Sequence, residues 1–346
     1  MKGKILIYHV AGIGDTLVAL PAFRMIRQNY PDAELHLLNI SVVPSLVQAE
    51  LYEHDTLFAK KTFLKSGGKL YFYWQYLLAV LRAPYSALFC FSPSEPKVLT
   101  SLFRLFHGRK IYHCNPDLSR DNIMLVEGYL RKLESFGMKR GEKLFDFVST
   151  PQEMQTAQQL KHDLLNGKNI PLIAFGIGGK EDVCRWPLDR YDDLIHRMKQ
   201  DFDFIPVYLG GPDERAAAQN FIQKHGGCFL LDSSCRSLRE TIAFLQCCCL
   251  CYIGNDTGSM HLAATAEIPC AAVFSAHDIP PMRWHPFSRN SFLLRHEMEC
   301  SGCRLRTCRF GSPAKCLAAI QVDELYSALR NWTVLKKFFA PRRQGD

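Results

Sequence analysis

Residues 4–39 decide the fold class and read KILIYHVAGIGDTLVALPAFRMIRQNYPDAELHLLN. Residues 4–10 form an apolar run of the length of a buried strand, and residues 12–14 form a glycine turn. Residues 16–30 carry apolar side chains at helical spacing, and residues 34–39 follow as a second strand. A strand, a helix and a strand over this length predict a parallel crossover unit.

The same alternation of strands and helices continues along the chain. We expect strands at residues 87–92, 110–113, 172–175, 206–209, 228–231, 249–253 and 271–274, with helices at 98–106, at 123–136 and between the later strands. A polar, charged segment at residues 137–151 separates two halves. The pattern predicts an α/β protein with two doubly wound, Rossmann-like domains, residues 1–150 and 151–330, and a tail at 331–346. Pro21 predicts a kink in the first helix or a later start for it.

Composition and charge narrow the class of partner. The 346 residues include 42 Lys and Arg against 34 Asp and Glu, a formal charge of +8 that favours anionic partners. The excess lies mainly in residues 60–69 and 295–343 rather than along one basic helix, so we do not expect nucleic-acid binding. The first residues lack the pattern of a signal peptide. The most apolar longer stretch, from about residue 71 to 91, is interrupted by Gln75, Arg82 and Pro84, so we expect a cytoplasmic protein that crosses no membrane.

Asp15 follows the glycine turn at the carboxyl end of the first strand and opens the helix. Open α/β sheets expose their ligand crevice at this position, so the carboxylate is a candidate catalytic group, and Gly12 and Gly14 are candidate donor-binding residues. An N-cap of the helix explains Asp15 equally well. The segment GIGDTL lacks the third glycine of a dinucleotide-binding fingerprint, which disfavours a dehydrogenase.

Two loops in the second half follow predicted strands and are candidates for phosphate binding. The segment GIGGKEDVCRWPLDRYDDLI could bind phosphate through the amide of Gly178 and the charges of Lys180 and Arg185. The alternative interpretation is an ordinary surface loop. In LGGPDERAAAQ, Asp213 and Glu214 are interpreted as helix-capping acids, with a contact to a ribose hydroxyl as the alternative.

The segment YIGNDTGSMHLAATAEIPCAAVF is the most specific of these motifs. A polar loop joins an apolar strand to a helix of small residues, and the amides and dipole of that helix suit a pyrophosphate. The candidate donor-binding residues here are Asn255, Asp256, Thr257, Gly258 and His261. A core histidine bonded to a backbone carbonyl is the alternative for His261.

The cysteines raise a separate question. Cys300, Cys303, Cys308 and Cys316 are spaced closely enough to hold a structural zinc ion, although the spacing is unlike that of common zinc ribbons. Reduced structural thiols and disulfides are the alternatives. The run of cysteines at residues 247–251 is interpreted as small buried hydrophobic residues.

The order of the motifs resembles glycosyltransferase family 9, the lipopolysaccharide heptosyltransferases, nearly from end to end. The matching segments are GIGDTLVALPAFRMIRQNYPDAELHLL, CRWPLDRYDDLI, GGPDERA, GNDTGSMHLAAT and the late CSGCRLRTC. The resemblance implies a GT-B fold, with the acceptor bound by the N-terminal domain and the nucleotide sugar by the C-terminal domain. It implies a final helix, for which residues 317–329 are the candidate.

The resemblance also implies a chemistry. Members invert the anomeric centre without a metal cofactor, and Asp15 matches their general base, while Asp256, Thr257, Gly258 and His261 match the donor site. The implied reaction moves heptose from ADP-heptose onto lipid A/core oligosaccharide or a related cell-envelope glycolipid. A differently specific or non-catalytic nucleotide-sugar protein, such as a hexosyltransferase or an epimerase, is the alternative.

Two further features follow from the resemblance. Many members carry lysine where this chain has Cys184, so Lys180 or Arg185 is expected to supply the missing charge. The basic, aromatic stretch at residues 60–84, with Phe72, Trp74 and Tyr76, is expected to contact the cytoplasmic face of the inner membrane, and an ordinary core helix is the alternative.

Overall fold

The structure is a computed structural model that describes residues 3–9, 11–39, 46, 55–59, 74, 77–92, 96–108, 110–118, 122–230 and 237–339. The chain divides into two compact units, Met1–Phe145 and Asp146–Asp346. The division lies a few residues before the expected boundary at 150. The second unit includes the expected tail, where Trp332, Leu335 and Phe339 are buried.

Unit 1 is built on a five-stranded sheet in the order β3-β2-β1-β4-β5, with every neighbouring pair parallel. Its strands are β1 (Lys4–His9), β2 (Glu34–Asn39), β3 (Thr56–Ala59), β4 (Tyr85–Cys90) and β5 (Ile111–His113). The chain runs from β1 to one edge and returns through β4 to the other. The order therefore reverses between β1 and β4, which is where such sheets bind ligands.

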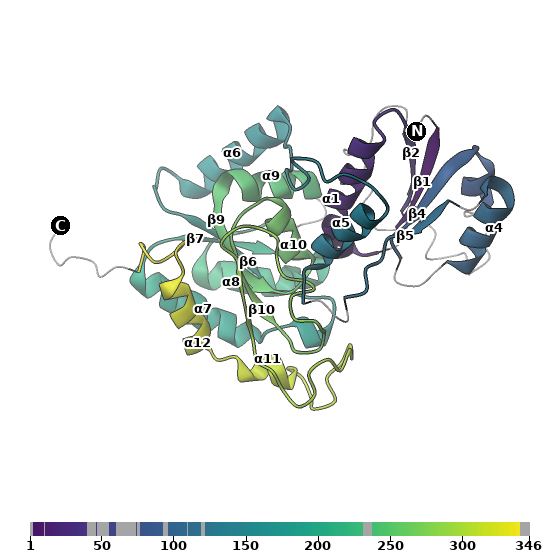
Figure 1. The fold of residues 1–346 in the computed structure, drawn as a ribbon. Helices are drawn as coiled ribbons and strands as arrows, with labels where there is room; N and C mark the ends of the chain where they lie inside the picture. Colours follow the sequence, from purple (N-terminus) through teal and green to yellow (C-terminus); the bar gives the residue numbers. More distant parts are fainter. Residues whose placement is uncertain are drawn as a thin grey trace. The chain divides into compact units, whose positions relative to one another are not determined.

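The helices of unit 1 are α1 (Ile13–Asn29), α4 (Lys97–His107) and α5 (Leu125–Ser135). Figure 1 shows α1 and α5 on one side of the sheet and α4 on the other. The two faces of the sheet pack against different helices. Leu6 and Leu88 pack with Phe103 of α4, whereas Phe91, the residue after β4, contacts Phe23 of α1. The helix α1 continues through Pro21 from a start at Ile13, so the expected later start is wrong.

Unit 2 is built on a six-stranded parallel sheet in the order β11-β10-β9-β6-β7-β8. Its strands are β6 (Leu172–Gly176), β7 (Ile205–Leu209), β8 (Cys228–Phe229), β9 (Cys249–Asn255), β10 (Cys270–Phe274) and β11 (Phe292–Arg295). The order reverses between β6 and β9, at the centre of the sheet. The carboxyl ends of these two strands therefore define the ligand-binding position of unit 2.

Helices cover both faces of the second sheet (Figure 1). They are α6 (Pro151–Leu165), α7 (Leu188–Asp201), α8 (Arg215–His225), α9 (Leu238–Cys248), α10 (Gly258–Thr265), α11 (Lys315–Ala319) and α12 (Val322–Asn331). One face packs against α7, α8 and α12, and the other against α9 and α10, with α6 packed on α9. The cysteine run is divided between the end of α9 and the buried start of β9.

The expected single final helix at 317–329 is wrong. The chain leaves helical geometry at Ile320 and begins α12 at Val322. The carbonyl of Ile320 accepts hydrogen bonds from the indole of Trp186, at 3.0 Å, and from Arg190. Because this oxygen bonds side chains of another segment, the break is part of the packing of unit 2.

The expected membrane-contact stretch at residues 60–84 lies largely outside the described residues, including Phe72 and Tyr76. Trp74 is described and is 57% exposed. Within the described part of the chain, no helix combines the length and hydropathy that a membrane span requires.

Candidate functional site

The loops after β6 and β9 meet at the reversal point of the second sheet. The side-chain amide of Asn255 donates to the carbonyl of Gly178 at 2.9 Å. A Cβ atom added at Gly179 would lie 3.3 Å from the methyl group of Thr257. The structure thus brings together the two segments that the sequence marked separately as phosphate-binding loops.

The helix α10 begins at this meeting point. Thr257 is its N-cap residue, and the first amides of a helix have no partner within the helix. Residues 256–259 are only partly buried, whereas residues 260–265 are buried. The exposed positive end of α10 is therefore directed to the carboxyl edge of the sheet, where an anion would be stabilised.

Asn255 makes its side-chain contacts within the protein. Its side chain is fully buried, and its Oδ1 atom accepts from the backbone amide of Trp186 at 3.0 Å and from the hydroxyl of Tyr191 at 2.8 Å. Together with the bond to Gly178, these contacts tie three points of the segment from residue 178 to residue 191 to the end of β9. These contacts give Asn255 a positioning role, and its expected contact with the donor stays a prediction.

His261 is a buried residue of the first turn of α10, with 3% of its surface exposed. Burial lowers its pKa to about 4, so the imidazole is neutral near pH 7. Its ring packs edge-on against Trp284 with centroids 5.9 Å apart, and its Nδ1 atom has no hydrogen-bond partner among the described residues. His261 therefore adds no positive charge to the site.

Glu214 connects the loop after β6 to the loop after β7. One carboxylate oxygen accepts from the amide of Gly211 at 2.7 Å, and the other accepts from Gly179 at 3.4 Å. A Cβ atom at Gly178 would lie 2.2 Å from Cγ of Glu214, so this approach requires glycine. The structure shows the expected capping contact of Glu214 and extends it to a second loop.

The two cations expected near this loop differ in their contacts. Arg185 donates from Nε to the carbonyl of Gly179 at 2.5 Å and forms an ion pair with Asp182 at 3.1 Å. Lys180 is exposed on the loop itself. Arg185 therefore shapes the glycine loop, and Lys180 projects from it.

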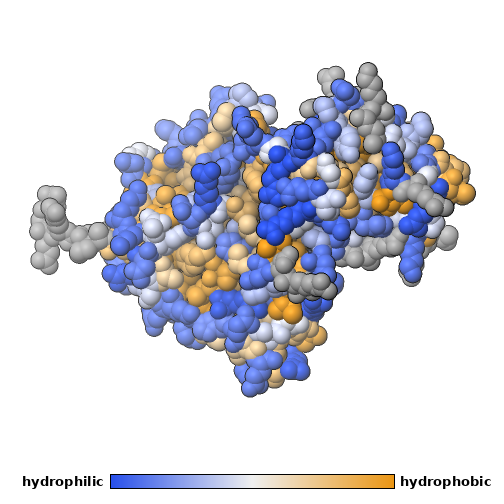
Figure 2. All heavy atoms as spheres, in the orientation of Figure 1, coloured by the Kyte–Doolittle hydropathy of each residue, from blue (hydrophilic) through white to orange (hydrophobic). Residues whose placement is uncertain are grey.

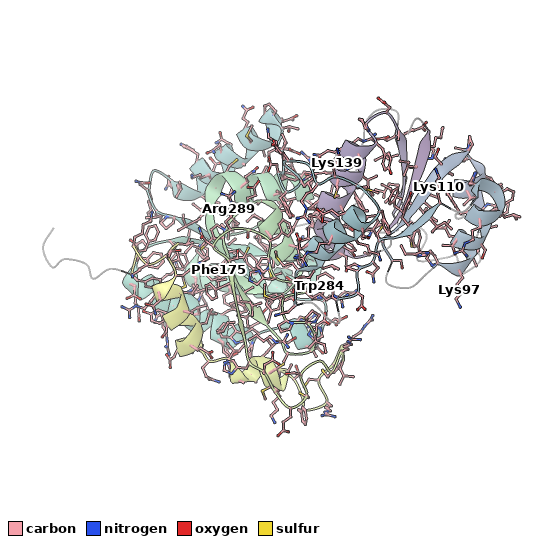
Figure 3. The ribbon with its side chains drawn as sticks, in the orientation of Figure 1. Lys97, Lys110, Lys139, Phe175, Trp284 and Arg289 are labelled. Carbon is pink, nitrogen blue, oxygen red and sulfur yellow. The ribbon has the colours of Figure 1, made fainter. Side chains whose placement is uncertain are left out.

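Arg283 is a third cation at this edge, and sequence reasoning missed it. It lies in the segment after β10, the strand beside β9, with its guanidinium 5.1 Å from the ring centre of Trp284 and 3.9 Å from Asp278. Trp284, which is labelled in Figure 3, donates to the second carboxylate oxygen of Asp278 at 2.6 Å. Since Trp284 also contacts His261, the cluster of Arg283, Trp284 and Asp278 is joined to α10. Arg283 follows β10, a parallel strand next to β9, and this position in the sequence is the signal that could have identified it.

In unit 1, Asp15 lies at the reversal point between β1 and β4. It is the third residue of α1, and its Oδ2 atom accepts from the amide of Gly12 at 3.1 Å, so the capping contact is present. Gly14 belongs to the same first turn. The hydroxyl of Thr16 donates to the carbonyl of Gly12 at 2.8 Å and lies 3.3 Å from Nε2 of His9. Asp15 is partly exposed on a turn that these contacts hold in place.

The sequence model described as "Glycosyltransferase family 9 (heptosyltransferase)" matches residues 121–313, which is more than half of the chain. The chain belongs to glycosyltransferase family 9. It is thus a glycosyltransferase, and the resemblance noted in its motifs is confirmed. Among curated proteins, none matches the sequence.

Solved structures of this family share the fold. A family 9 glycosyltransferase from Veillonella parvula DSM 2008 is 17% identical, with a TM-score of 0.70, over 96% of this chain and 97% of that one. ADP-heptose lps heptosyltransferase II of E. coli is 16% identical, with a TM-score of 0.68, over 98% and 100%. E. coli heptosyltransferase WaaC, with ADP-2-deoxy-2-fluoro heptose, is 16% identical, with a TM-score of 0.62, over 94% and 99%. The expected GT-B fold is confirmed.

Cys184 lies at the position where the resemblance to the family leads us to expect a lysine. It is half-buried, and burial together with the neighbouring charge of Asp256 raises the pKa of its thiol. The side chain is therefore neutral near pH 7. The proximity to Asp256 places position 184 beside the start of α10, where a lysine would reach an anion.

The expected metal site at the late cysteines of this family 9 chain stays a prediction. Cys300, Cys303, Cys308 and Cys316 line one pocket together with apolar side chains. Among the described residues, no group of three or more His, Cys, Asp or Glu is arranged to hold a metal ion, and all four cysteines are free of disulfides. Burial raises the pKa of the Cys316 thiol.

Proposed function

We propose that this glycosyltransferase moves a sugar from a nucleotide-diphosphate donor, first of all heptose from ADP-heptose, onto lipid A/core oligosaccharide or a related cell-envelope glycolipid. The observation that carries the proposal is the meeting of the loops after β6 and β9 at the exposed start of α10. In a family 9 chain, this is the part of unit 2 with the amides, dipole and nearby cations that a diphosphate requires.

The proposed reaction is a single displacement with inversion. An acceptor hydroxyl attacks the anomeric carbon, its proton passes to the carboxylate of Asp15, and the bond from the anomeric carbon to the diphosphate oxygen breaks. The electron pair of that bond leaves with the nucleoside diphosphate. A partly exposed carboxylate on a fixed turn suits a general base. We propose unit 1 as the acceptor-binding unit and unit 2 as the donor-binding unit.

Charge stabilisation in this proposal comes from the protein, without a metal cofactor. The amides at the start of α10 would face the departing diphosphate, and Lys180, Arg185 and Arg283 are the cations near that edge. Cys184 contributes no charge. The alternative proposal is therefore a donor with another sugar and another nucleotide than ADP-heptose, as in a hexosyltransferase. The lipid nature of the acceptor would place the protein at the cytoplasmic face of the inner membrane.

The test is a donor and acceptor panel. Purified protein would be titrated with ADP-heptose and with UDP- and GDP-sugars, and then incubated with each donor and detergent-solubilised lipopolysaccharide core acceptors, with and without EDTA. We expect one nucleotide class to bind selectively and to support transfer that EDTA leaves unchanged. Binding without transfer to any acceptor would instead support a non-catalytic nucleotide-sugar protein, and loss of transfer in EDTA would contradict metal independence.

A further inference from the structure

His9 is the last residue of β1, and its side chain lies inside unit 1 with 1% of its surface exposed. The imidazole packs edge-on against the rings of Phe23 and Phe91, with centroids 5.5 Å and 6.4 Å away. Burying a polar ring among aromatic side chains costs free energy unless the ring forms hydrogen bonds. The bonds of His9 therefore indicate what this polar side chain does at the end of β1.

The hydroxyl of Thr16 fixes the tautomer of His9. Thr16 is also buried, and its hydroxyl donates its one hydrogen to the carbonyl of Gly12 at 2.8 Å. The same oxygen lies 3.3 Å from Nε2 of His9. Since the hydroxyl hydrogen is already used, the oxygen accepts from His9, so Nε2 carries the hydrogen and Nδ1 does not. Nδ1 has no hydrogen-bond partner among the described residues, and burial lowers the pKa of His9 to about 4, so the ring is neutral near pH 7.

Gly12 connects this pair to Asp15. Its carbonyl accepts from the hydroxyl of Thr16 and from the amide of Thr16, the latter at 3.1 Å, and its own amide donates to Oδ2 of Asp15 at 3.1 Å. We call residues 12–16 the Asp15 turn. A chain of hydrogen bonds thus runs from the buried ring of His9 through Thr16 and Gly12 to one oxygen of the carboxylate.

We propose that His9 is a positioning residue for Asp15, the proposed general base. The Nε2–H group of His9 holds Thr16, and through it the Asp15 turn. Oδ2 then stays on the amide of Gly12, and Oδ1 is left to take the proton of the acceptor hydroxyl. The inference rests on the proposed function, because it concerns the base of that reaction. A neutral ring suits this role, because a cation beside the carboxylate would make it a weaker base.

The experiment uses the full chain in detergent, with the donor and acceptor that the panel identifies. His9→Phe keeps an aromatic ring and removes the hydrogen-bond donor, whereas His9→Gln places an amide nitrogen near the position of Nε2. Thr16→Val removes the hydroxyl, and Thr16→Ser keeps it.

The matched control is Thr100→Val. Thr100 is a buried threonine in the first turn of α4, and its hydroxyl donates to the carbonyl of Lys97 at 3.1 Å. The helix α4 lies on the other side of the sheet from α1 (Figure 1), at the end of unit 1 where Figure 2 shows exposed hydrophobic residues. The control therefore removes the same kind of bond away from the Asp15 turn.

We expect His9→Phe and Thr16→Val each to lower kcat about tenfold, which is the effect of one lost buried hydrogen bond on a single step. The donor Kd should stay within about twofold of wild type, because the donor is proposed to bind unit 2. His9→Gln, Thr16→Ser and Thr100→Val should all transfer at the wild-type rate. The double variant His9→Phe/Thr16→Val should lose no more than either single variant, because both changes remove the same bond.

The Asp15→Asn background separates positioning from a general loss of folding. Asparagine cannot take the proton, so its exact position has little effect on the residual rate. His9→Phe should therefore lower the residual transfer of Asp15→Asn by less than about twofold, whereas a loss of folded protein would lower both rates by the same factor. An equal loss in both backgrounds, a wild-type kcat in His9→Phe, or equal losses in His9→Gln and His9→Phe would each overturn the positioning role.

Amide hydrogen exchange separates this proposal from the proposed function. On peptides that cover residues 11–17, His9→Phe and Thr16→Val should speed exchange of the bonded amides of Gly12 and Thr16 about tenfold, and Thr100→Val should leave it unchanged. Unchanged exchange in His9→Phe would overturn the positioning role. Absence of transfer by wild-type protein with every donor and acceptor would instead contradict the proposed function, and the exchange would still decide whether His9 holds the turn.

Discussion

Cys184 carries no positive charge, so other residues of this enzyme must stabilise a departing diphosphate. A neutral thiol lies where the resemblance to the family predicts a lysine, close to Asp256 and the start of α10. Arg185 is committed to the glycine loop, whereas Arg283 is held through Trp284 against His261. At the residue scale, we propose that Lys180, Arg185 and Arg283 supply the charge that Cys184 lacks.

We predict that Arg283→Ala and the pair Lys180→Ala/Arg185→Ala each lower kcat/KM for the donor by about 10- to 100-fold. A charge-assisted hydrogen bond contributes ~1.5–3 kcal/mol, which corresponds to this range. Steady-state kinetics with the donor found in the panel would measure the effect. Arg289→Ala, at an exposed arginine elsewhere in unit 2, is the matched control and should be silent. Unchanged donor affinity and turnover in all the variants would show that these cations do not replace the lysine.

His9 gives unit 1 a pH dependence. Burial lowers its pKa from 6.5 to about 4, so below pH 6.5 the unfolded chain takes up a proton that the folded chain refuses. The free energy of unfolding therefore falls as the pH falls through this window. From about pH 7 to about pH 5 the loss should be about 2 kcal/mol.

The variant His9→Phe removes this titration and keeps a ring beside Phe23 and Phe91. Urea unfolding at the two pH values should show a pH-dependent loss about 2 kcal/mol smaller than in wild type. The exposed His162→Gln is the control and should follow wild type. An identical loss in His9→Phe would mean that other groups cause the pH dependence.

At the scale of elements, strands and helices were predictable where the chain is periodic, and loops were not. The strand at 34–39 and the turn after β1 follow from local apolar runs and glycines. β3 and β11 have four residues each, too few to show a pattern. At the break, the carbonyl of Ile320 accepts a hydrogen bond from Trp186, which lies over a hundred residues earlier in the chain. No local sequence pattern therefore predicts the break.

The loops of the candidate site show the same limit. Their nearness to one another follows from parallel strand order, but the buried position of Asn255 does not, because its partners lie more than 60 residues away in the sequence. The motif around it reads equally well as a ligand loop. Only the fold shows that the side-chain amide of Asn255 forms hydrogen bonds with other residues of the protein.

We predict that Asn255→Ala lowers the free energy of unfolding of unit 2 by about 2 to 4 kcal/mol, since the amide of Trp186 and the hydroxyl of Tyr191 lose a buried acceptor. Urea unfolding followed by tryptophan fluorescence would measure it. The exposed Asn220→Ala should change stability by less than about 0.5 kcal/mol. Wild-type stability with weakened donor binding would instead favour direct contact of Asn255 with the donor.

At the scale of the whole molecule, the two units repeat one design. In each, a parallel sheet reverses its strand order beside its first strand, and a glycine-containing loop follows that strand. The sequence predicted this duplication from its alternation of elements. The proposal that unit 1 binds the acceptor and unit 2 binds the donor is tested by measuring donor binding and sugar transfer.

Asp15→Asn tests the central claim most directly. An asparagine oxygen can still accept from the amide of Gly12, so the turn should keep its structure, but it cannot take the acceptor proton. Donor affinity by calorimetry and transfer by product release should be measured on the same preparation. The account predicts a donor Kd within about twofold of wild type and transfer reduced about 10²- to 10⁴-fold. Full turnover by Asp15→Asn would contradict it.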